Sequence, residues 1–402
     1  MNSRERYILY QTCYAHFMAH FNMQVFPALV LPLATLYRMD MAQVVGMSFG
    51  MYLLFGLSAL VWGPLADRLG PRPLMLLFYS GAAVAAGLCA LQYRDPAVLP
   101  VCLAALGFFS GIYHPVGLGW LSKEMRRISR ALALNGIFGS LGIALAPLTA
   151  GLAIRLWGIS GAFMLVAIVN GLGVLLMLVF AERPRELRED VTPAATGHSR
   201  PVPFAVLLVI MMLAGLVYRG STVILPACLE LRNAGLLELA RSFAGEWLTA
   251  NLAATMTAGL ILLPTIFGQY AGGFLAERFD LRLTYLLFHA ITIPAILVMA
   301  HAFDLPLVFM GIAYFFFLLG TQPIENTLVA RYTPDRFRHS AFGLKFALTF
   351  GAGALAVKMI AVVKKTGSLE DVYQLLAGVS LLLVCCIVIL ILVTRPQRKP
   401  QS

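Results

Sequence analysis

Long apolar stretches separated by short polar segments run along almost the whole chain. Most hold about 20 apolar residues, the length that an α-helix needs to cross a hydrocarbon core of about 30 Å. Because lipid offers the backbone no hydrogen-bond partners, such stretches must be helical. The pattern predicts twelve transmembrane helices, at residues 8–36, 43–65, 73–92, 97–121, 130–153, 158–181, 203–229, 252–276, 283–301, 305–330, 340–363 and 371–393.

The segment 182–202 differs from its surroundings. It is rich in charged residues, Pro, Thr, Ser and Gly, which indicates a solvated linker. This linker divides the twelve predicted helices six from six. The sequence therefore predicts an all-α membrane protein of two pseudo-symmetric six-helix bundles, with residues 1–181 in the first bundle and 203–402 in the second.

Composition supports the membrane class. Of 402 residues, 60% are hydrophobic and only 12% are charged, whereas soluble domains carry about 25% charged residues. The formal net charge is +11, but Lys and Arg are spread over many short loops, so nucleic acid is not an expected partner. The six cysteines lack metal-ligand spacing with one another or with histidine. Neither a metal nor a cofactor is expected.

Lys and Arg also predict the orientation of the chain. Most of them fall in the loops on one side, which include both termini and the linker. Basic loops stay in the cytoplasm, so the chain is expected in a bacterial-type inner membrane with both termini cytoplasmic. A monomer is the default expectation for this architecture.

The predicted external loop at 230–250 is unusually long. Leu and Phe recur in it at helical intervals among charged residues, which indicates an amphipathic helix lying on the outer surface. The alternative is that the helices at 203–229 and 252–276 extend beyond the bilayer.

Two loops, one in each predicted bundle, repeat the same pattern. The first runs from Gly63 to Arg72 and the second from Gly273 to Arg282, and they align without gaps. In each loop a glycine permits close helix approach, and an acid followed by a base supplies charges that pair across helix ends.

These paired loops resemble the signature of the major facilitator superfamily, whose 6+6 helix arrangement would cover the whole chain. The first copy departs at Pro71, where a basic residue is usual, and the second has Glu277 and Asp280 in place of the usual Asp and Gly. The resemblance implies alternating access around a midplane cavity. It implies a gating role for Gly63, Asp67, Arg68, Gly70, Arg72, Gly273, Glu277, Arg278 and Arg282.

Two further segments resemble parts of particular facilitators. The helix at 130–153 is similar to an antiporter motif, in which Gly142, Pro147 and Gly151 would form a smooth, bent packing face. The alternative is an ordinary packed helix rich in small residues. The pair His114-Pro115, with two histidines in the first helix, resembles the fosmidomycin-resistance type of exporter. This resemblance names no substrate.

Polar and ionisable groups inside the predicted helices mark the candidate site, because a charge at a helix centre costs about 2.5–3.5 kcal/mol. The residues expected to bind substrate or carry protons are His16, His20, Gln24, Tyr113, His114, Tyr218, Arg219, Glu325 and Lys345.

Arg219 is the main candidate for binding an anion, since its planar guanidinium suits a carboxylate or phosphonate. The alternative is a structural pair with a helix-end carbonyl or with Glu325. Glu325 and Lys345 are expected at similar depth as a buried ion pair, with Glu325 as the proton-coupling carboxylate or, alternatively, in a purely structural role.

His16 and His20 share one helix face, which Gln24 continues. They are expected to bind substrate or carry a proton, or else to be hydrogen-bonded packing residues. Pro115 leaves a carbonyl one turn earlier unpaired, so Tyr113 and His114 are alternatively explained as partners for such groups.

Together these features predict a secondary transporter. The expected activity is proton-coupled export of a small anionic or amphiphilic molecule, and proton-linked uptake of an organic anion is the alternative. A membrane-embedded enzyme or sensor is disfavoured, because the sequence holds no nucleophile elbow, phosphate-binding glycine loop or His/Glu metal spacing.

Overall fold

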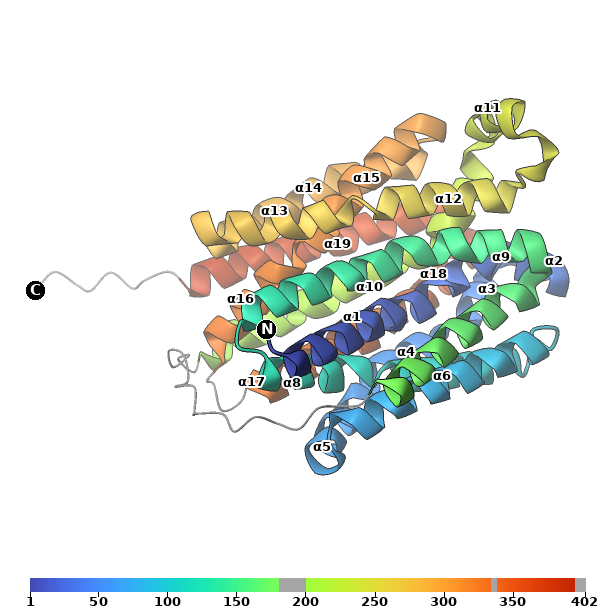
Figure 1. The fold of residues 1–402 in the computed structure, drawn as a ribbon. Coiled ribbons are helices and arrows are strands. Elements are labelled where there is room, and N and C mark those ends of the chain that lie inside the picture. Colours follow the sequence, from blue (N-terminus) through green and yellow to red (C-terminus); the bar gives the residue numbers. More distant parts are fainter. Residues whose placement is uncertain (181–199, 334–337, 395–402) are drawn as a thin grey trace, which may run out of the picture.

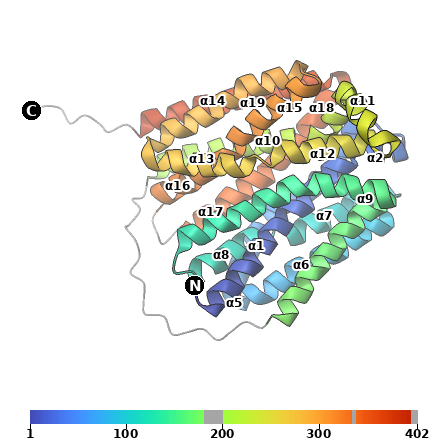
Figure 2. The same cartoon turned by 45° about the horizontal axis from the view of Figure 1, so that its top comes forward.

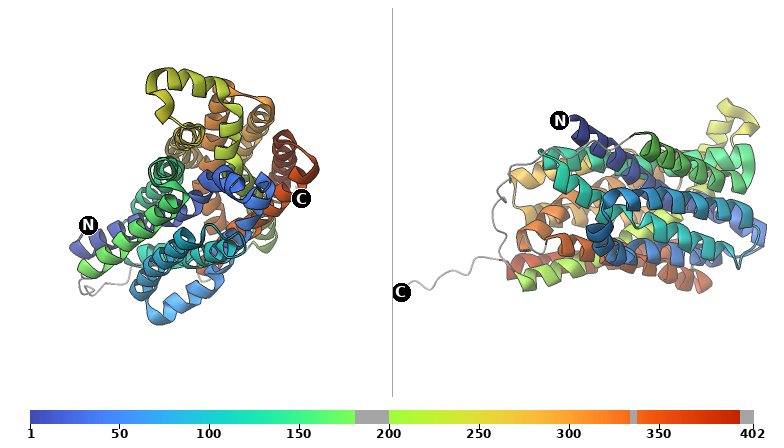
Figure 3. Two further views of the ribbon diagram at one scale, coloured as in Figure 1. Left: turned by 90° about the vertical axis from the view of Figure 1, so that its right-hand side faces the viewer. Right: turned by 60° about the horizontal axis from the view of Figure 1, so that its bottom comes forward.

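The computed structural model describes residues 1–180, 200–333 and 338–394, and in these ranges the regular elements are all helices (Figure 1). The helices run roughly parallel to one long axis. Seen along that axis, the blue-to-green helices of the first half and the yellow-to-red helices of the second gather on different sides (Figure 3, left). The predicted all-α membrane fold is confirmed.

The helices of the N-terminal half, residues 1–180, are α1 (Ser3–Gln24), α2 (Phe26–Tyr37), α3 (Met41–Met47), α4 (Phe49–Leu57), α5 (Ala59–Leu69), α6 (Pro71–Gln92), α7 (Leu99–Ser110), α8 (Tyr113–Glu124) and α9 (Ile128–Val179).

The α-helices of the C-terminal half, residues 200–394, are α10 (Pro201–Arg232), α11 (Ala234–Ala244), α12 (Ala250–Leu262), α13 (Thr265–Arg278), α14 (Leu281–His301), α15 (Asp304–Gly320), α16 (Gln322–Tyr332), α17 (Arg338–Phe346), α18 (Leu355–Thr366) and α19 (Leu369–Val393). Three short elements join them, the 3₁₀ turn η1 (Gly245–Trp247), the π-helical turn η3 (Ala347–Gly351) and the 3₁₀ turn η4 (Ala352–Ala354).

Ten helical segments of the described chain are long and apolar enough to span a membrane, or eleven if the pair Met41–Leu57 and Ala59–Leu69, bent by 41°, counts as one. The predicted count of twelve requires dividing α9. This helix has 52 residues, which at 1.5 Å per residue would be about 78 Å long, far more than a bilayer core of about 30 Å. It breaks at Gly158, whose φ of 71° lies in the left-handed region that glycine adopts without strain.

Several predicted spans are interrupted helices, and neighbouring side chains satisfy the backbone at the breaks. Between α7 and α8, the N–H of Ile112 bonds to Phe109 O instead of the carbonyl of Phe108. Phe108 O accepts instead from Ser58 Oγ and from Trp62 Nε1, each at 3.2 Å. Helix interruptions in a membrane survive only where such partners exist. The alternative roles of Tyr113 and His114 concern the carbonyl one turn before Pro115 and stay predictions.

The two halves repeat one packing arrangement. A Cβ added at Gly63 would lie 3.7 Å from Pro115 Cβ, and one added at Gly273 would lie 3.7 Å from Pro323 Cβ. Likewise Arg72 Nη2 donates to Met177 O near the end of α9, and Arg282 Nη1 donates to Thr394 O after α19, both at 3.1 Å. The repeated loops therefore occupy equivalent places in the two halves, and each forms a hydrogen bond to an equivalent helix end.

Both described chain ends lie at the end of the bundle that carries these loops (Figures 1 and 2). Arg4 near the N-terminus bonds Glu124 at the end of α8. The predicted linker at 182–202 falls almost wholly on residues outside the described ranges, so the boundaries at 181 and 203 stay predictions.

The segment 230–250 forms the separate helix α11 at the opposite end (Figure 1). Asp304 Oδ1 accepts from Leu236 N at 2.8 Å, which fixes its first turn. Leu239 and Phe243 remain exposed, as on an amphipathic helix at a membrane surface. The predicted separate helix is present, and long extensions of the two flanking helices are wrong. Its place on the outer membrane surface stays a prediction.

Gly142 provides a stability test of the close contact between α9 and α1. A Cβ there would fall on the carbonyl oxygen of Phe17, whereas one at Gly171, in the same helix, would meet nothing within 4 Å. Overpacking costs about 1–3 kcal/mol, so G142A should lower the thermal unfolding midpoint in detergent. G171A should leave it unchanged or slightly raised. Equal midpoints for the two variants would contradict this packing.

Candidate functional site

A cavity of about 1560 Å³ lies between the two halves. Both repeated loops line its mouth, through Asp67 and Gly70 of the first and Glu277 of the second. Its inner part is lined by His16, His20 and His114 from the N-terminal half and by Glu325, Lys345 and Phe350 from the C-terminal half. The cavity is therefore open at the end of the bundle that carries the chain termini.

Three histidines from two helices meet at the inner end of the cavity. His16 and His20 lie one turn apart on α1, and their Nε2 atoms are 3.2 Å apart. His114 comes from α8, and the ligating atoms of all three lie within 4.8 Å of one another. His16 Nδ1 is 2.8 Å from the carbonyl oxygen of Asn135.

Aromatic rings surround His114 and fix its position. Its ring centroid lies 4.7 Å from that of Phe346, 5.0 Å from Phe350 and 5.4 Å from Phe55. Phe346 directly precedes the π-helical turn η3 and Phe350 lies within it; such a turn is a local widening of the helix that is frequent at functional sites. The ring of Tyr113 stacks on that of His16 with 4.9 Å between centroids, and its hydroxyl donates to Asn135 Oδ1 at 2.8 Å.

Glu325 and Lys345 form the predicted buried ion pair, with 3.3 Å between Oε2 and Nζ. Both side chains are about 5% exposed although they line the cavity. Tyr285 OH donates to the other carboxylate oxygen at 3.0 Å, and Lys345 Nζ donates to Asn326 Oδ1 at 2.6 Å. The pair is thus held by a hydrogen-bond network, as a buried charge requires.

Arg219 lies farther from solvent than the sequence suggested. It is 3% exposed and is not among the residues that line the cavity. Its guanidinium carbon lies 3.7 Å above the ring centroid of Tyr52, across the interface between the halves, and its Nη1 has no hydrogen-bond partner. The alternative of a pair with Glu325 is not found among the described contacts, where Glu325 pairs with Lys345.

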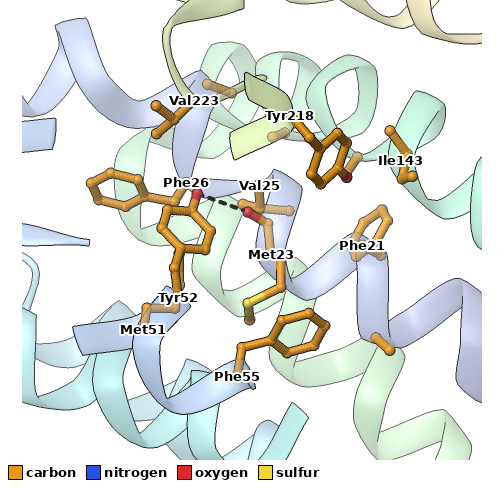
Figure 4. Close-up of a cluster of buried hydrophobic side chains, with 14 of the residues drawn as sticks. Phe21, Met23, Val25, Phe26, Met51, Tyr52, Phe55, Ile143, Tyr218 and Val223 are labelled. Atoms are coloured by element: carbon orange, nitrogen blue, oxygen red, sulfur yellow. Dashed lines mark hydrogen bonds between the residues drawn. The ribbon is translucent and has the colours of Figure 1, made fainter. Parts of the chain in front are cut away.

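Gln24 and Tyr218 accompany Arg219 at the closed end. Gln24 Nε2 donates to Tyr218 OH at 3.4 Å across the interface. Figure 4 shows Tyr218 and Tyr52 among buried apolar side chains around Met23, whose carbonyl accepts from Tyr52 OH at 3.1 Å. This layer begins one turn beyond His20 along α1 and closes the cavity.

Contacts between the halves continue toward the closed end. Asn251 Nδ2 donates to Ala28 O at 3.0 Å, and Arg155 Nε donates to Trp247 O at 2.9 Å. A Cβ added at Gly151 would collide with Thr255 of the C-terminal half. The small residues of α9 therefore let the halves approach closely where the cavity ends, while Pro147 lies within the same helix.

At the mouth, the charges of the two loops make local contacts. Lys123 Nζ pairs with Asp67 at 3.0 Å, but both side chains are more than half exposed, so the pair contributes little stability. Arg278 lies over the ring of Phe274 at 4.0 Å. Arg282 hydrogen-bonds to Asp280 and holds the pKa of that carboxyl to about 2, so Asp280 caps α14 in its charged form. No specific partner is described for Arg68 or Glu277.

Sequence reasoning missed the groups that position the predicted site residues. Asn135, Tyr52 and Phe350 were not singled out, although Asn135 is a polar residue within an apolar helix and was detectable for that reason. The aromatic residues carried no such signal, because phenylalanine and tyrosine are common throughout membrane helices.

Comparison with known proteins agrees with this geometry. The sequence model of the Major Facilitator Superfamily matches residues 12–357. No curated protein matches significantly. Among solved structures, a POT family transporter in complex with 5-aminolevulinic acid has a TM-score of 0.76 at 13% identity, covering 96% of each chain.

Two other solved structures share the fold. The nucleoside transporter NupG has a TM-score of 0.71 at 15% identity, covering 95% of this chain and 99% of that one. A bacterial homologue of the human lysosomal transporter Spinster, in an inward-facing and unoccupied conformation, has a TM-score of 0.68 at 14% identity, covering 97% and 96%.

The buried ion pair can be tested by a double-mutant cycle. Lys345→Met leaves Glu325 without its counter-charge, which for a buried pair costs about 3–5 kcal/mol. Thermal unfolding in detergent should show a large loss of stability for Lys345→Met and for Glu325→Leu, and recovery of much of it in the double variant. Additive losses in the double variant would show that the two charges do not interact.

Proposed function

Because this chain belongs to the Major Facilitator Superfamily, we propose that it exports a small anionic or amphiphilic molecule in exchange for protons. Transport proceeds by alternating access between two states of the cavity. The chain acts as a monomer in a bacterial inner membrane. Its structural neighbours are transporters, in line with a small-molecule substrate rather than a reaction.

The observation that carries the proposal is the free hydrogen-bonding capacity of Arg219. A buried guanidinium that leaves Nη1 unpaired has paid a desolvation cost without full compensation. An anionic ligand would supply the missing acceptors, and a carboxylate or phosphonate matches the planar fork. Arg219 also touches Tyr52 across the interface, so its exposure depends on how the two halves are placed.

The distribution of charge supports the orientation. The mouth lies beside the basic loops and the chain termini, and basic loops stay in the cytoplasm. The described conformation is then open to the cytoplasm, where an exporter collects its substrate. As the halves rock, the layer of Gln24, Tyr52 and Tyr218 separates and Arg219 faces the outside.

Glu325 is the proposed proton carrier. In an exchange, the proton binds Glu325 while the cavity faces outward and leaves it while the cavity faces the cytoplasm. Proton binding from outside separates Glu325 from Lys345, and proton release to the cytoplasm lets the ion pair re-form. Tyr285 and Asn326 hold the pair in position in the cytoplasm-open state.

The tight closure of the other end supports exchange. Gly151 brings α9 against Thr255 on α12 of the C-terminal half, where the cavity ends, and leaves no room for an added side chain. Gly142 packs α9 equally closely against α1 within the N-terminal half. An exchanger must block protons while its cavity faces inward, and close helix packing does this. The resemblance of this helix to an antiporter motif fits the same role.

The Arg219→Gln variant tests the site. We expect it to fold and insert normally but to lose anion transport, because the amide has neither the charge nor the fork of guanidinium. Arg94→Gln, at an exposed arginine beside Tyr93, is the matched control and should transport normally. The measurement is a screen of organic anions on acid-loaded inside-out vesicles, in which an exported substrate collapses the pH gradient.

Unchanged transport in Arg219→Gln would remove this residue from the site. If an added substrate instead dissipated an acid-outside gradient across right-side-out vesicles, by entering together with protons, the protein would be a proton-linked importer and the direction proposed above would be wrong.

A further inference from the structure

The histidine cluster of His16, His20 and His114 has a geometry that neither substrate binding nor proton coupling requires. Its three imidazoles come together at one point, with all ligating atoms within 4.8 Å. Sequence spacing did not indicate this, since His114 lies on another helix. We propose that the histidine cluster binds one divalent transition-metal ion, such as Zn²⁺ or Co²⁺, with a coordination position left open to the cavity.

The spacing of His16 and His20 suits a shared ion. Two imidazole nitrogens bound tetrahedrally to Zn²⁺ at 2.0–2.1 Å lie about 3.3 Å apart. The Nε2 atoms of His16 and His20 are 3.2 Å apart. An ion between them needs little movement of either ring, and the ligating nitrogen of His114 already lies within 4.8 Å of both.

A backbone carbonyl orients the first ligand. The oxygen of Asn135 accepts from Nδ1–H of His16, which leaves the Nε2 lone pair directed at His20. Metal-binding histidines typically donate their second ring N–H to such a group. With His16 in this tautomer, His20 Nε2–H donates to it when no ion is bound. Binding a metal moves that proton to His20 Nδ1, so both rings stay neutral.

The protein also makes room for these rings. A Cβ added at Gly139 of α9 would lie 2.7 Å from Cε1 and Nε2 of His16, so no larger residue fits there. Phe55, Phe346 and Phe350 enclose His114 and restrict its rotation. Restricting ligand side chains in advance lowers the entropy lost on metal binding.

The charges near the histidine cluster determine which ligand can fill the open coordination position of the metal. The cationic groups around the histidine cluster are Lys345, which Glu325 neutralises at 3.3 Å, and Arg219, which stacks on Tyr52. Arg219 disfavours a bare cation, but an anion from the cavity bound as the fourth ligand would offset its charge. Three protein ligands plus one open position is the arrangement of exchangeable zinc sites.

The test is Co²⁺ binding to the full chain, purified in detergent without a histidine tag. Four-coordinate Co²⁺ absorbs visible light far more strongly than the hydrated ion, so the spectrum reports both binding and geometry. We expect saturation at one Co²⁺ per chain and displacement by Zn²⁺. His114→Gln and His16→Gln should each weaken binding by at least about 100-fold, and Gly139→Ala should weaken it through His16.

His289→Gln is the matched control, because His289 is equally buried but lies in α14, outside the histidine cluster. It should bind Co²⁺ as the unmodified protein does. Thermal unfolding of each variant without metal identifies any variant that fails to fold. The Co²⁺ affinities of the remaining histidine variants then test the proposal. Absence of saturable binding, or equal binding in all variants, would overturn the proposal. Because the readout requires no transport, it is independent of the proposed export.

Discussion

The structure depends on one constraint. A polar or charged group inside a lipid bilayer must find its hydrogen-bond or ion-pair partners within the protein. The interrupted helices obey it, since Ser58 and Trp62 bond the carbonyl that the break before α8 leaves free. The charges obey it too, because Glu325 and Lys345 satisfy each other beside the cavity. Several buried polar atoms of the described residues lack a partner, and Arg219 Nη1, at the closed end, is the one that belongs to a charged side chain. The proposed substrate site rests on that unpaired nitrogen.

A second feature is that the two halves pack closely at one end of the bundle and stand apart around the cavity at the other. Gly142 brings α9 against the backbone of α1 and Gly151 brings it against the side chain of Thr255, while the repeated loops line the mouth of the cavity. The same pair of loops ties equivalent helix ends in both halves, through Arg72 and Arg282. These bonds join helix ends within each half, as the proposed rocking of the two halves requires.

Sequence reasoning recovered the membrane fold, the repeated loops, the separate helix α11 and the Glu325–Lys345 pair, because length, periodicity and isolated charge are local properties. It could not give the meeting of His114 with His16 and His20, which depends on how α8 packs against α1. It placed Arg219 in the binding cavity, whereas the side chain lies behind the closing layer of Tyr52 and Tyr218. Helix breaks were also missed, since tertiary partners such as Trp62 stabilise them.

The central claim is that the open and closed ends exchange. It can be measured by electron paramagnetic resonance distances in a cysteine-free background, with one spin-label pair at Leu69 and Phe279 beside the mouth and another at Trp157 and Leu239 at the opposite end. All four side chains are exposed. Across a pH titration in liposomes, a short-distance population at the mouth should grow together with a long-distance population at the other end. Distances that change at one end alone, or in the same direction at both, would contradict alternating access.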